Sequence, residues 1–212
     1  MIELIDVTKK YGAVTVYEKL NLSFDDNSVT AILGKSGSGK TTLLNLLAGL
    51  TDYEGVIKNL PENVSYVFQE DRLVPGLTVM QNLELVVNNK DIKGSLENAG
   101  LFGVEKRYPK ELSGGMARRV SILRAFLYDS DLMLLDEPFK DLDLGLKYKI
   151  MDYFKEMRKN NMITTVFVTH DIDEAIYLSD RVIVIDEGKV MIDLPSAEFG
   201  IRDALFRLMK EL

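Results

Sequence analysis

The strongest constraint on the fold is a short apolar run that leads directly into a glycine-rich segment and then into a helical pattern. Val29–Leu33 has the length and composition of one buried strand. The pattern Gly-x-x-Gly-x-Gly-Lys-Thr follows it at 34–41, and leucines at helical spacing follow at 43–47. A strand, a glycine-rich turn and a helix in this order predict a loop that binds phosphate groups.

The chemistry of this loop follows from its residue types. Glycines let backbone N–H groups converge on anionic oxygens, and the helix N-terminus adds about half a positive charge. Lys40 is expected to reach the β- and γ-phosphates of a nucleotide, and the Thr41 hydroxyl to bind Mg²⁺. An ordinary glycine–serine turn is the alternative. The residues expected around the phosphates are Gly34, Lys35, Ser36, Gly37, Ser38, Gly39, Lys40, Thr41 and Thr42.

A second apolar run, at 132–135, ends in two carboxylates. Adjacent residues at a strand end point in opposite directions, so Asp136 and Glu137 can have different roles. Asp136 is expected to hold Mg²⁺ through a water molecule, and Glu137 to align a water on the γ-phosphate. The alternative is an acidic turn that closes the strand before Pro138.

A second device for binding anions lies at 112–116, before a helical pattern. Ser113, Gly114 and Gly115 at a helix start can present backbone N–H groups to an anion, although Ser-Gly-Gly is also a common N-cap. One nucleotide has a single triphosphate. This second device therefore serves another ligand or the nucleotide of another subunit.

The remaining patterns predict an α/β protein with a parallel sheet. Alternating apolar residues at 2–7 and 14–24 predict antiparallel strands, and 132–135 and 165–169 predict buried strands preceded by helices at about 115–127 and 144–160. A hairpin is expected at 182–192 and a terminal amphipathic helix at 196–212. Strand patterns are missing between about 72 and 128, where helices at 79–87, around 95–101 and at 115–127 predict a helical insertion.

Composition excludes several other classes of protein. The 26 basic and 33 acidic residues give a net charge of −7, which argues against a nucleic-acid partner. The absence of cysteine excludes disulfides and thiolate chemistry. Neither a signal peptide nor an apolar run of about 18 residues is visible, so we expect a soluble, cytoplasmic chain. The basic residues around 106–119, including Arg118, are expected to form a solvated face.

These motifs, together with Gln69 and His170, stand in an order that resembles the ATP-binding cassette of ABC transporters. The string Leu-Ser-Gly-Gly at 112–115 is the hallmark of that family, and 68–79 is most similar to importers of nitrate, sulfonate and taurine. The resemblance implies a P-loop NTPase (RecA-like) core with an antiparallel β subdomain and an inserted helical subdomain. The core would comprise 1–71 and 129–212, and the helical subdomain 72–128.

The resemblance also implies roles for single residues. Gln69 would touch Mg²⁺ and the attacking water, His170, the chain's single histidine, would contact the γ-phosphate, and Tyr11 would stack on adenine. Alternatively, Gln69 is an exposed polar residue, His170 a structural histidine and Tyr11 an ordinary aromatic at a strand end. Residues 113–115 would act in trans on the ATP of a partner. Residues 141–143 resemble an inter-subunit loop, with Lys140 and Asp141 where many cassettes have smaller residues.

The resemblance implies an ATPase that powers solute transport with ATP and Mg²⁺, most similar to an importer. Its partners would be a second copy in a head-to-tail dimer, integral membrane subunits that dock near 73–79 and, as a further candidate, a solute-binding protein. It would lie on the inner face of the cell membrane as a peripheral, cytoplasmic protein. An exporter or a cell-division cassette is the main alternative. A DNA-repair or ribosome-associated cassette and a small-molecule kinase are weaker ones.

Overall fold

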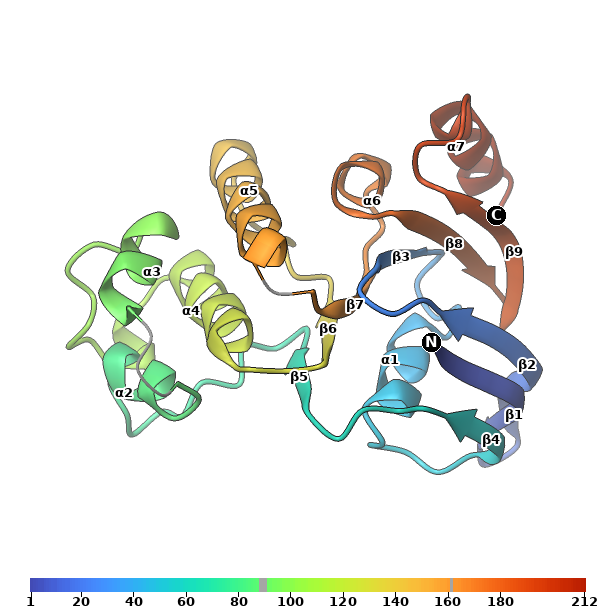
Figure 1. The fold of residues 1–212 in the computed structure, drawn as a ribbon, viewed down its shortest axis with the longest axis horizontal. Coiled ribbons are helices and arrows are strands. Elements are labelled where there is room, and N and C mark those ends of the chain that lie inside the picture. Colours follow the sequence, from blue (N-terminus) through green and yellow to red (C-terminus); the bar gives the residue numbers. More distant parts are fainter. Residues whose placement is uncertain (88–90, 161) are drawn as a thin grey trace. The chain divides into compact units, whose positions relative to one another are not determined.

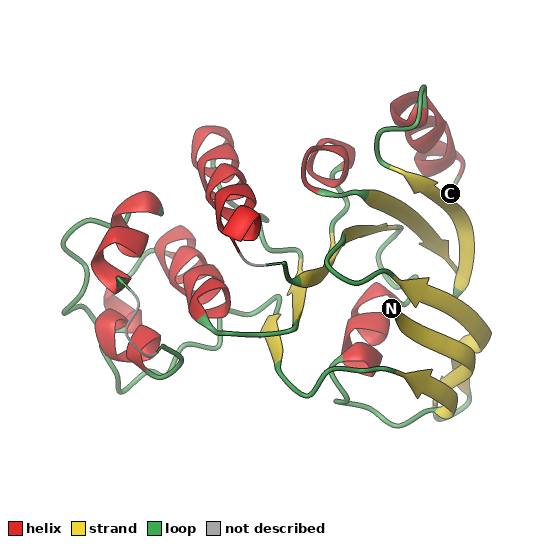
Figure 2. Ribbon diagram, in the orientation of Figure 1, coloured by secondary structure: helices red, strands yellow, loops and turns green. Residues whose placement is uncertain are grey.

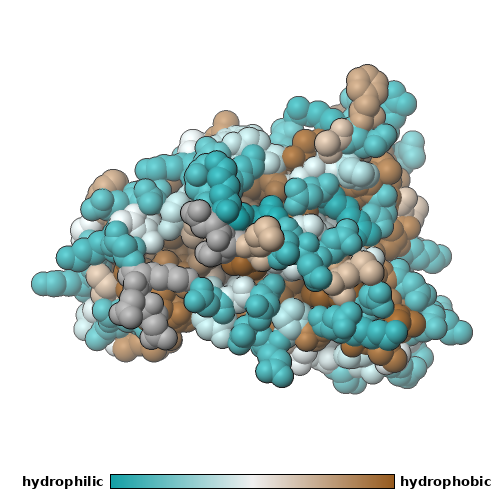
Figure 3. All heavy atoms as spheres, in the orientation of Figure 1, coloured by the Kyte–Doolittle hydropathy of each residue, from teal (hydrophilic) through white to brown (hydrophobic). Residues whose placement is uncertain are grey.

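The computed structural model describes residues 1–87, 91–160 and 162–212. Contacts divide the chain into two compact units (Figure 1). Unit 1 comprises Met1–Val64, Asp131–Asp136 and Ile163–Leu212, and unit 2 comprises Ser65–Ser130 and Glu137–Met162. Among the described residues, no helix combines the length and apolarity that crossing a bilayer requires. Figure 3 shows hydrophilic side chains over much of the visible face, with hydrophobic atoms in smaller patches among them.

The first sheet of unit 1 is antiparallel, as the alternating pattern predicts. Its strands β1 (Ile2–Tyr11), β2 (Val14–Phe24) and β4 (Glu54–Lys58) lie in the order β2-β1-β4. Ile2, Leu4 and Val7 are buried. Side chains of a strand alternate between its faces, and a register shift between Leu4 and Val7, where Asp6 has a φ of 49°, brings Val7 inward as well.

The second sheet of unit 1 contains the buried parallel strands. Its strands are adjacent in the order β6 (Leu132–Asp136), β7 (Thr164–Val168), β3 (Val29–Leu33), β8 (Arg181–Asp186) and β9 (Lys189–Pro195). The pairs β3·β7, β3·β8 and β6·β7 are parallel, and β9 pairs antiparallel with β8 through the predicted hairpin. Every residue of β3, β6 and β7 is buried, which explains why their sequences are mainly apolar. The short β5 (Val64–Val67) carries the chain from unit 1 into unit 2.

The helices of unit 1 follow the strands. They are α1 (Lys40–Leu47), α6 (Ile172–Leu178) and α7 (Ile201–Glu211) (Figure 2). The terminal helix begins at Ile201 and not at Ser196 as expected. Gly200, its N-cap, has a φ of 78°, so the chain turns sharply there before the helix can start. Helix α7 then buries Ile201 and Leu205.

Unit 2 is built of helices around its own apolar cluster. Its helices are α2 (Val79–Glu84), α3 (Ile92–Asn98), the 3₁₀ helix η1 (Pro109–Glu111), α4 (Gly114–Leu127) and α5 (Leu144–Asn160). Helix α2 is shorter than the expected range 79–87, and α3 begins and ends earlier than the expected range 95–101. The fully or almost fully buried members of the cluster are Val79, Leu83, Leu96, Ala99, Leu101, Val104, Val120, Leu123 and Leu127.

Helix α5 belongs to unit 2, although we expected all of 129–212 to belong to the ATPase core. Tyr153 packs against the apolar cluster of unit 2, and its hydroxyl lies 3.1 Å from the Ser95 Oγ. These contacts join residues far apart in the sequence and place α5 with α3 and α4. The functional division at 72–128 stays a prediction.

Candidate nucleotide-binding site

The glycine-rich loop lies between β3 and α1, and two of its glycines cannot be replaced without a clash. Gly34 has a φ of 152°, and a Cβ there would lie 2.1 Å from the Ile185 carbonyl oxygen. Gly39 has a φ of 103°, and its Cβ would lie 2.8 Å from the Tyr17 hydroxyl. That hydroxyl donates to the Gly39 carbonyl at 2.9 Å. Strand β8 at Gly34 and strand β2 at Gly39 therefore approach the loop so closely that glycine is required at both positions.

The loop holds a cation and an unsatisfied hydroxyl. Lys40 is buried, and its Nζ donates to the carbonyl oxygens of Gly34 at 2.8 Å and Lys35 at 2.6 Å. The Ser38 Oγ is buried without a hydrogen-bond partner among the residues described. A buried polar group left unpaired costs roughly 1–3 kcal/mol, a cost that a phosphate oxygen accepting from this hydroxyl would offset.

Two oxygens meet beside the loop. The Thr41 hydroxyl donates to the Asp136 Oδ2 at 2.8 Å, and Asp136 is buried at the end of β6. No group of three or more His, Cys, Asp or Glu side chains that could hold a metal lies within the described part of the chain. A divalent cation could therefore take these two oxygens but would need further ligands from water or phosphate. Mg²⁺ is commonly bound in this way.

Tyr11 ends β1 at the surface of unit 1, with 48% of its area exposed. Sequence reasoning missed its neighbour Lys9, which is buried and places its Nζ 4.4 Å from the centre of the Tyr11 ring. The same ammonium donates to the Asp52 Oδ1 at 2.6 Å, a hydrogen bond that lowers the pKa of Asp52. The signal was available, because Lys9 stands two residues after the buried Val7, a spacing that turns both side chains to one side of a strand.

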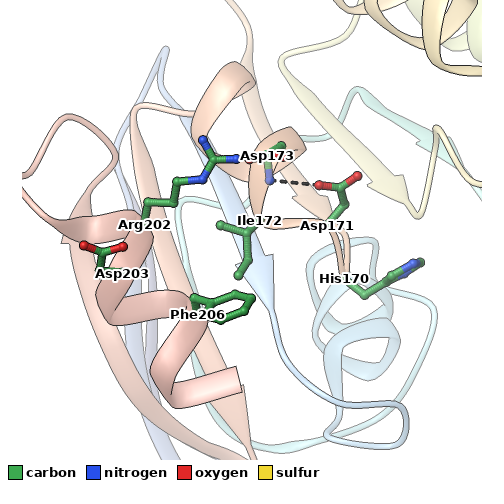
Figure 4. Close-up of a pocket in the computed structure, with 7 residues that line it drawn as sticks. All are labelled: His170, Asp171, Ile172, Asp173, Arg202, Asp203 and Phe206. Carbon is green, nitrogen blue, oxygen red and sulfur yellow. Dashed lines mark hydrogen bonds and ion pairs between the residues drawn. The ribbon is translucent and has the colours of Figure 1, made fainter. Parts of the chain in front are cut away.

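His170 follows Thr169, the first residue after β7, and is exposed. It lines a cavity of about 490 Å³ beside α6 and α7. Figure 4 shows its ring pointing away from Phe206, which lies near Ile172. Arg202 of α7 forms an ion pair with Asp173. The sequence did not indicate this cavity, because it depends on where α7 packs.

Glu137 has a strained backbone in unit 2. Its φ is 45°, which is unusual for a residue with a side chain and costs on the order of 1–3 kcal/mol unless its surroundings impose it. The Oε2 atom lies 3.4 Å from the Lys140 Nζ, and 19% of the Glu137 side chain is exposed. Lys140 therefore pairs with the carboxylate to which we assign the water-aligning role.

The second anion-binding device is also in unit 2, at the start of α4. The Ser113 Oγ accepts a hydrogen bond from the Met116 N–H at 3.3 Å and caps the helix. Gly114 is exposed, and open space surrounds the position that its Cβ would occupy. The first turn of a 14-residue helix is thus accessible to a ligand or to another molecule.

Arg118 corrects the expectation of a solvated basic face. Its side chain is buried inside unit 2. It donates hydrogen bonds to the backbone carbonyls of two residues proposed to be catalytic, Gln69 at 3.2 Å and Glu137 at 2.7 Å. Gln69 itself is exposed. Sequence patterns did not reveal this link because its partners are backbone atoms distant in the chain.

The segment predicted to receive a membrane subunit is partly internal. Val79 is fully buried in the apolar cluster of unit 2, so its side chain cannot line a docking surface. Val74, with 40% of its area exposed, remains available for one.

The structure thus distributes the predicted residues between its two units. Unit 1 contains Tyr11, the loop at 34–42, Asp136 and His170, with Thr41 and Asp136 in direct contact. Unit 2 contains Gln69, Glu137 and the string at 113–115.

Comparison with known proteins gives the family that the motifs resemble. Residues 17–140 match the sequence family described as "ABC transporter". The aliphatic sulfonates import ATP-binding protein SsuB 2 of Pseudomonas syringae pv. tomato is 41% identical over 194 residues, covering 88% of this chain and 84% of that protein. The SsuB protein of Bacillus cereus is 41% identical over 199 residues, covering 86% and 79%.

Solved structures agree with the sequences. The dimeric structure of MJ0796, a bacterial ABC transporter cassette, matches with a TM-score of 0.83 and 29% identity, covering 94% of this chain and all (100%) of that one. A post-hydrolysis state of MJ0796 bound to ADP and Pi matches with a TM-score of 0.81. The chain therefore belongs to the ABC transporter family and is an ATP-binding, ATP-hydrolysing subunit of that family.

Proposed function

We propose that the chain powers the import of a small solute as half of a head-to-tail dimer docked on integral membrane subunits. The observation that carries this proposal is the presence of two separate anion-binding devices, the loop at 34–42 and the accessible first turn of α4. A single ATP needs one phosphate loop. The first turn of α4 would therefore bind the nucleotide held by a second copy.

Relatives named for aliphatic sulfonates import support a solute of that kind. A solute-binding protein would deliver it to the membrane subunits. The dimeric cassette MJ0796 supports association of two copies. The dimer would lie on the inner face of the membrane, where ATP is available.

In unit 1, the chain's residues would bind and orient ATP. The loop N–H groups and Lys40 would surround the β- and γ-phosphates, where the carbonyls of Gly34 and Lys35 already hold the ammonium. Tyr11 would stack on the adenine, and His170 would contact the γ-phosphate. Thr41 and Asp136 fit Mg²⁺, which when bound would neutralise charge on the phosphates.

In unit 2, Glu137 and Gln69 would place the attacking water. Phosphoryl transfer requires mainly positioning and charge stabilisation from the protein, so the orientation of these side chains matters more than their basicity. The backbone of both residues is held by Arg118, which fixes where their side chains start.

The substitution Glu137→Gln tests this function because it keeps the size of the side chain and removes its charge. We expect hydrolysis to fall by about 10²-fold or more, with ATP binding retained and an ATP-dependent dimer that persists. Phosphate release, binding of a fluorescent ATP analogue and light scattering measure the three properties.

Glu187→Gln is the matched control, since Glu187 is also in the left-handed region (φ 44°) but lies in the β8–β9 turn. It should hydrolyse ATP like the unaltered protein. Near-normal turnover in Glu137→Gln would refute the assigned role, and a fully active monomer would refute the dimer.

A further inference from the structure

Arg118 is a buried charge whose hydrogen bonds join separate segments of unit 2. It lies on α4, roughly one and a half turns beyond the Ser113 cap, and is only 6% exposed. Its Nε donates to the Pro138 carbonyl at 3.0 Å and its Nη2 to the Glu137 carbonyl at 2.7 Å. The guanidinium therefore fixes the backbone that follows β6.

The other side of the same guanidinium holds the loop that carries Gln69. Its Nη1 donates to the carbonyls of Phe68 and Gln69 and lies 3.6 Å from the Asp71 Oδ1. Burial raises the pKa of Asp71, and the charge of Arg118 opposes that rise. One side chain thus connects the Gln69 loop with the turn at Glu137.

This arrangement requires arginine. A buried charge is costly unless its polar atoms are satisfied, and the carbonyl acceptors, which lie in different directions, match the planar fork of a guanidinium. Lysine would bring a point charge without that fixed geometry. The hydrogen bond at Glu137 also helps to impose the φ of 45°, since such strain persists only where the surroundings determine it.

The position of Arg118 on α4 connects the start of this helix with the backbone at Gln69 and Glu137. Helix α4 begins with the string at 113–115, which we place on the ATP of the partner, whereas Gln69 and Glu137 act on the ATP of their own chain. A rigid helix that shifts when its first turn binds a γ-phosphate would move Arg118 and, with it, both backbone segments.

We propose that Arg118 is a positioning residue that couples the two ATP sites of the dimer, because it ties the partner-facing start of α4 to Gln69 and Glu137. This inference rests on the proposed function. Coupling of this kind predicts that hydrolysis depends cooperatively on ATP concentration and that the cooperativity requires the guanidinium.

The experiment compares Arg118→Gln and Arg118→Lys with the unaltered protein and with Arg119→Gln. Arg119 is the matched control, because it lies on the same helix and donates to the carbonyls of Gly115, Ala99 and Gly100, away from Gln69 and Glu137. The rate of hydrolysis is measured against ATP concentration, and ATP affinity is measured separately with a fluorescent analogue.

For both Arg118 variants we expect kcat to fall by about tenfold or more and the Hill coefficient to fall from above 1 to about 1. ATP affinity should stay within about twofold, because Arg118 is remote from the phosphate loop in sequence and its hydrogen bonds to Gln69, Glu137 and Pro138 lie within unit 2. Arg119→Gln should keep the Hill coefficient of the unaltered protein. Arg118→Lys should not restore the turnover or the cooperativity that Arg118→Gln loses. If Arg118 served folding alone, both Arg118 variants would be less stable, but they would not lose kcat and cooperativity while keeping ATP affinity.

Cooperative hydrolysis that persists in folded Arg118 variants would overturn the inference, as would a Hill coefficient of 1 in the unaltered protein. If the variants do not fold, amide exchange of the unaltered protein is followed during ATP titration. Protection of 114–117, 68–71 and 137–139 with one midpoint supports the coupling, and separate midpoints refute it. A chain that binds or hydrolyses no ATP would instead refute the proposed function.

Discussion

At the scale of single residues, the site depends on positions where the fold permits only one kind of side chain. Gly34 and Gly39 lie where a Cβ would meet neighbouring atoms, and Lys9 is buried between the Tyr11 ring and Asp52. A cation at a ring face contributes about 0.5–2 kcal/mol. Lys9 therefore limits how far the Tyr11 ring can turn.

Gly34→Ala should disable nucleotide binding. The added Cβ would lie 2.1 Å from a backbone oxygen, which cannot move away like a flexible side chain. We expect the strand and loop to separate, with ATP affinity down at least tenfold and stability down by about 1–3 kcal/mol. Equilibrium binding and urea unfolding measure the two effects.

Gly76→Ala is the control, because its φ is not positive and open space surrounds its Cβ position. Unchanged ATP affinity in Gly34→Ala would contradict the steric argument.

At the scale of elements, α2 shows how a helix of only six residues is kept intact. Its first N–H groups all have partners: those of Val79 and Met80 donate to the carbonyls of Arg107 and Glu105, and that of Gln81 donates to the Thr78 Oγ1. The Gln81 side chain accepts in return from the Thr78 N–H, which completes a capping box. These groups replace the hydrogen bonds that a helix start lacks.

Thr78→Ala should lower the free energy of unfolding by about 1 kcal/mol, because it removes the acceptor of the Gln81 N–H. For a chain of this length, this corresponds to a fall in the melting temperature of roughly 2–4 °C. Circular dichroism during heating measures it. Thr78→Ser retains the hydroxyl and should melt like the unaltered protein, and equal losses in both variants would show that the methyl group is responsible.

At the scale of the whole molecule, each copy contains both anion-binding devices, so the proposed function links completion of an ATP site to association. A ligand that binds only the folded state stabilises it by RT ln(1 + [L]/Kd), about 2.7 kcal/mol at a hundredfold excess over Kd. If the bound state is a dimer, the stabilisation also depends on protein concentration.

In the Glu137→Gln protein with saturating ATP, the melting temperature should therefore rise with protein concentration. Without ATP it should not change. Differential scanning calorimetry over a hundredfold range of protein concentration measures both series. A shift caused by ATP that is the same at every protein concentration would indicate a monomer with a complete site.

The phosphate loop, the buried parallel strands and the carboxylate at the end of β6 were predictable from the sequence. Each is a local property: glycines where the backbone takes unusual conformations, mainly apolar residues where both faces of a strand are covered, and a carboxylate as the last residue of such a strand. The family match and the structural neighbours confirm the fold class. The roles of single residues stay predictions.

The tertiary structure decided the features that depend on distant parts of the chain. The burial of Arg118, the place of α5 in unit 2 and the internal position of Val79 could not be read from charge or periodicity. The physical reason is that burial of a charged side chain depends on which distant backbone carbonyls and carboxylates surround it. Local sequence sets the conformation of a segment, whereas only the packed chain provides those partners.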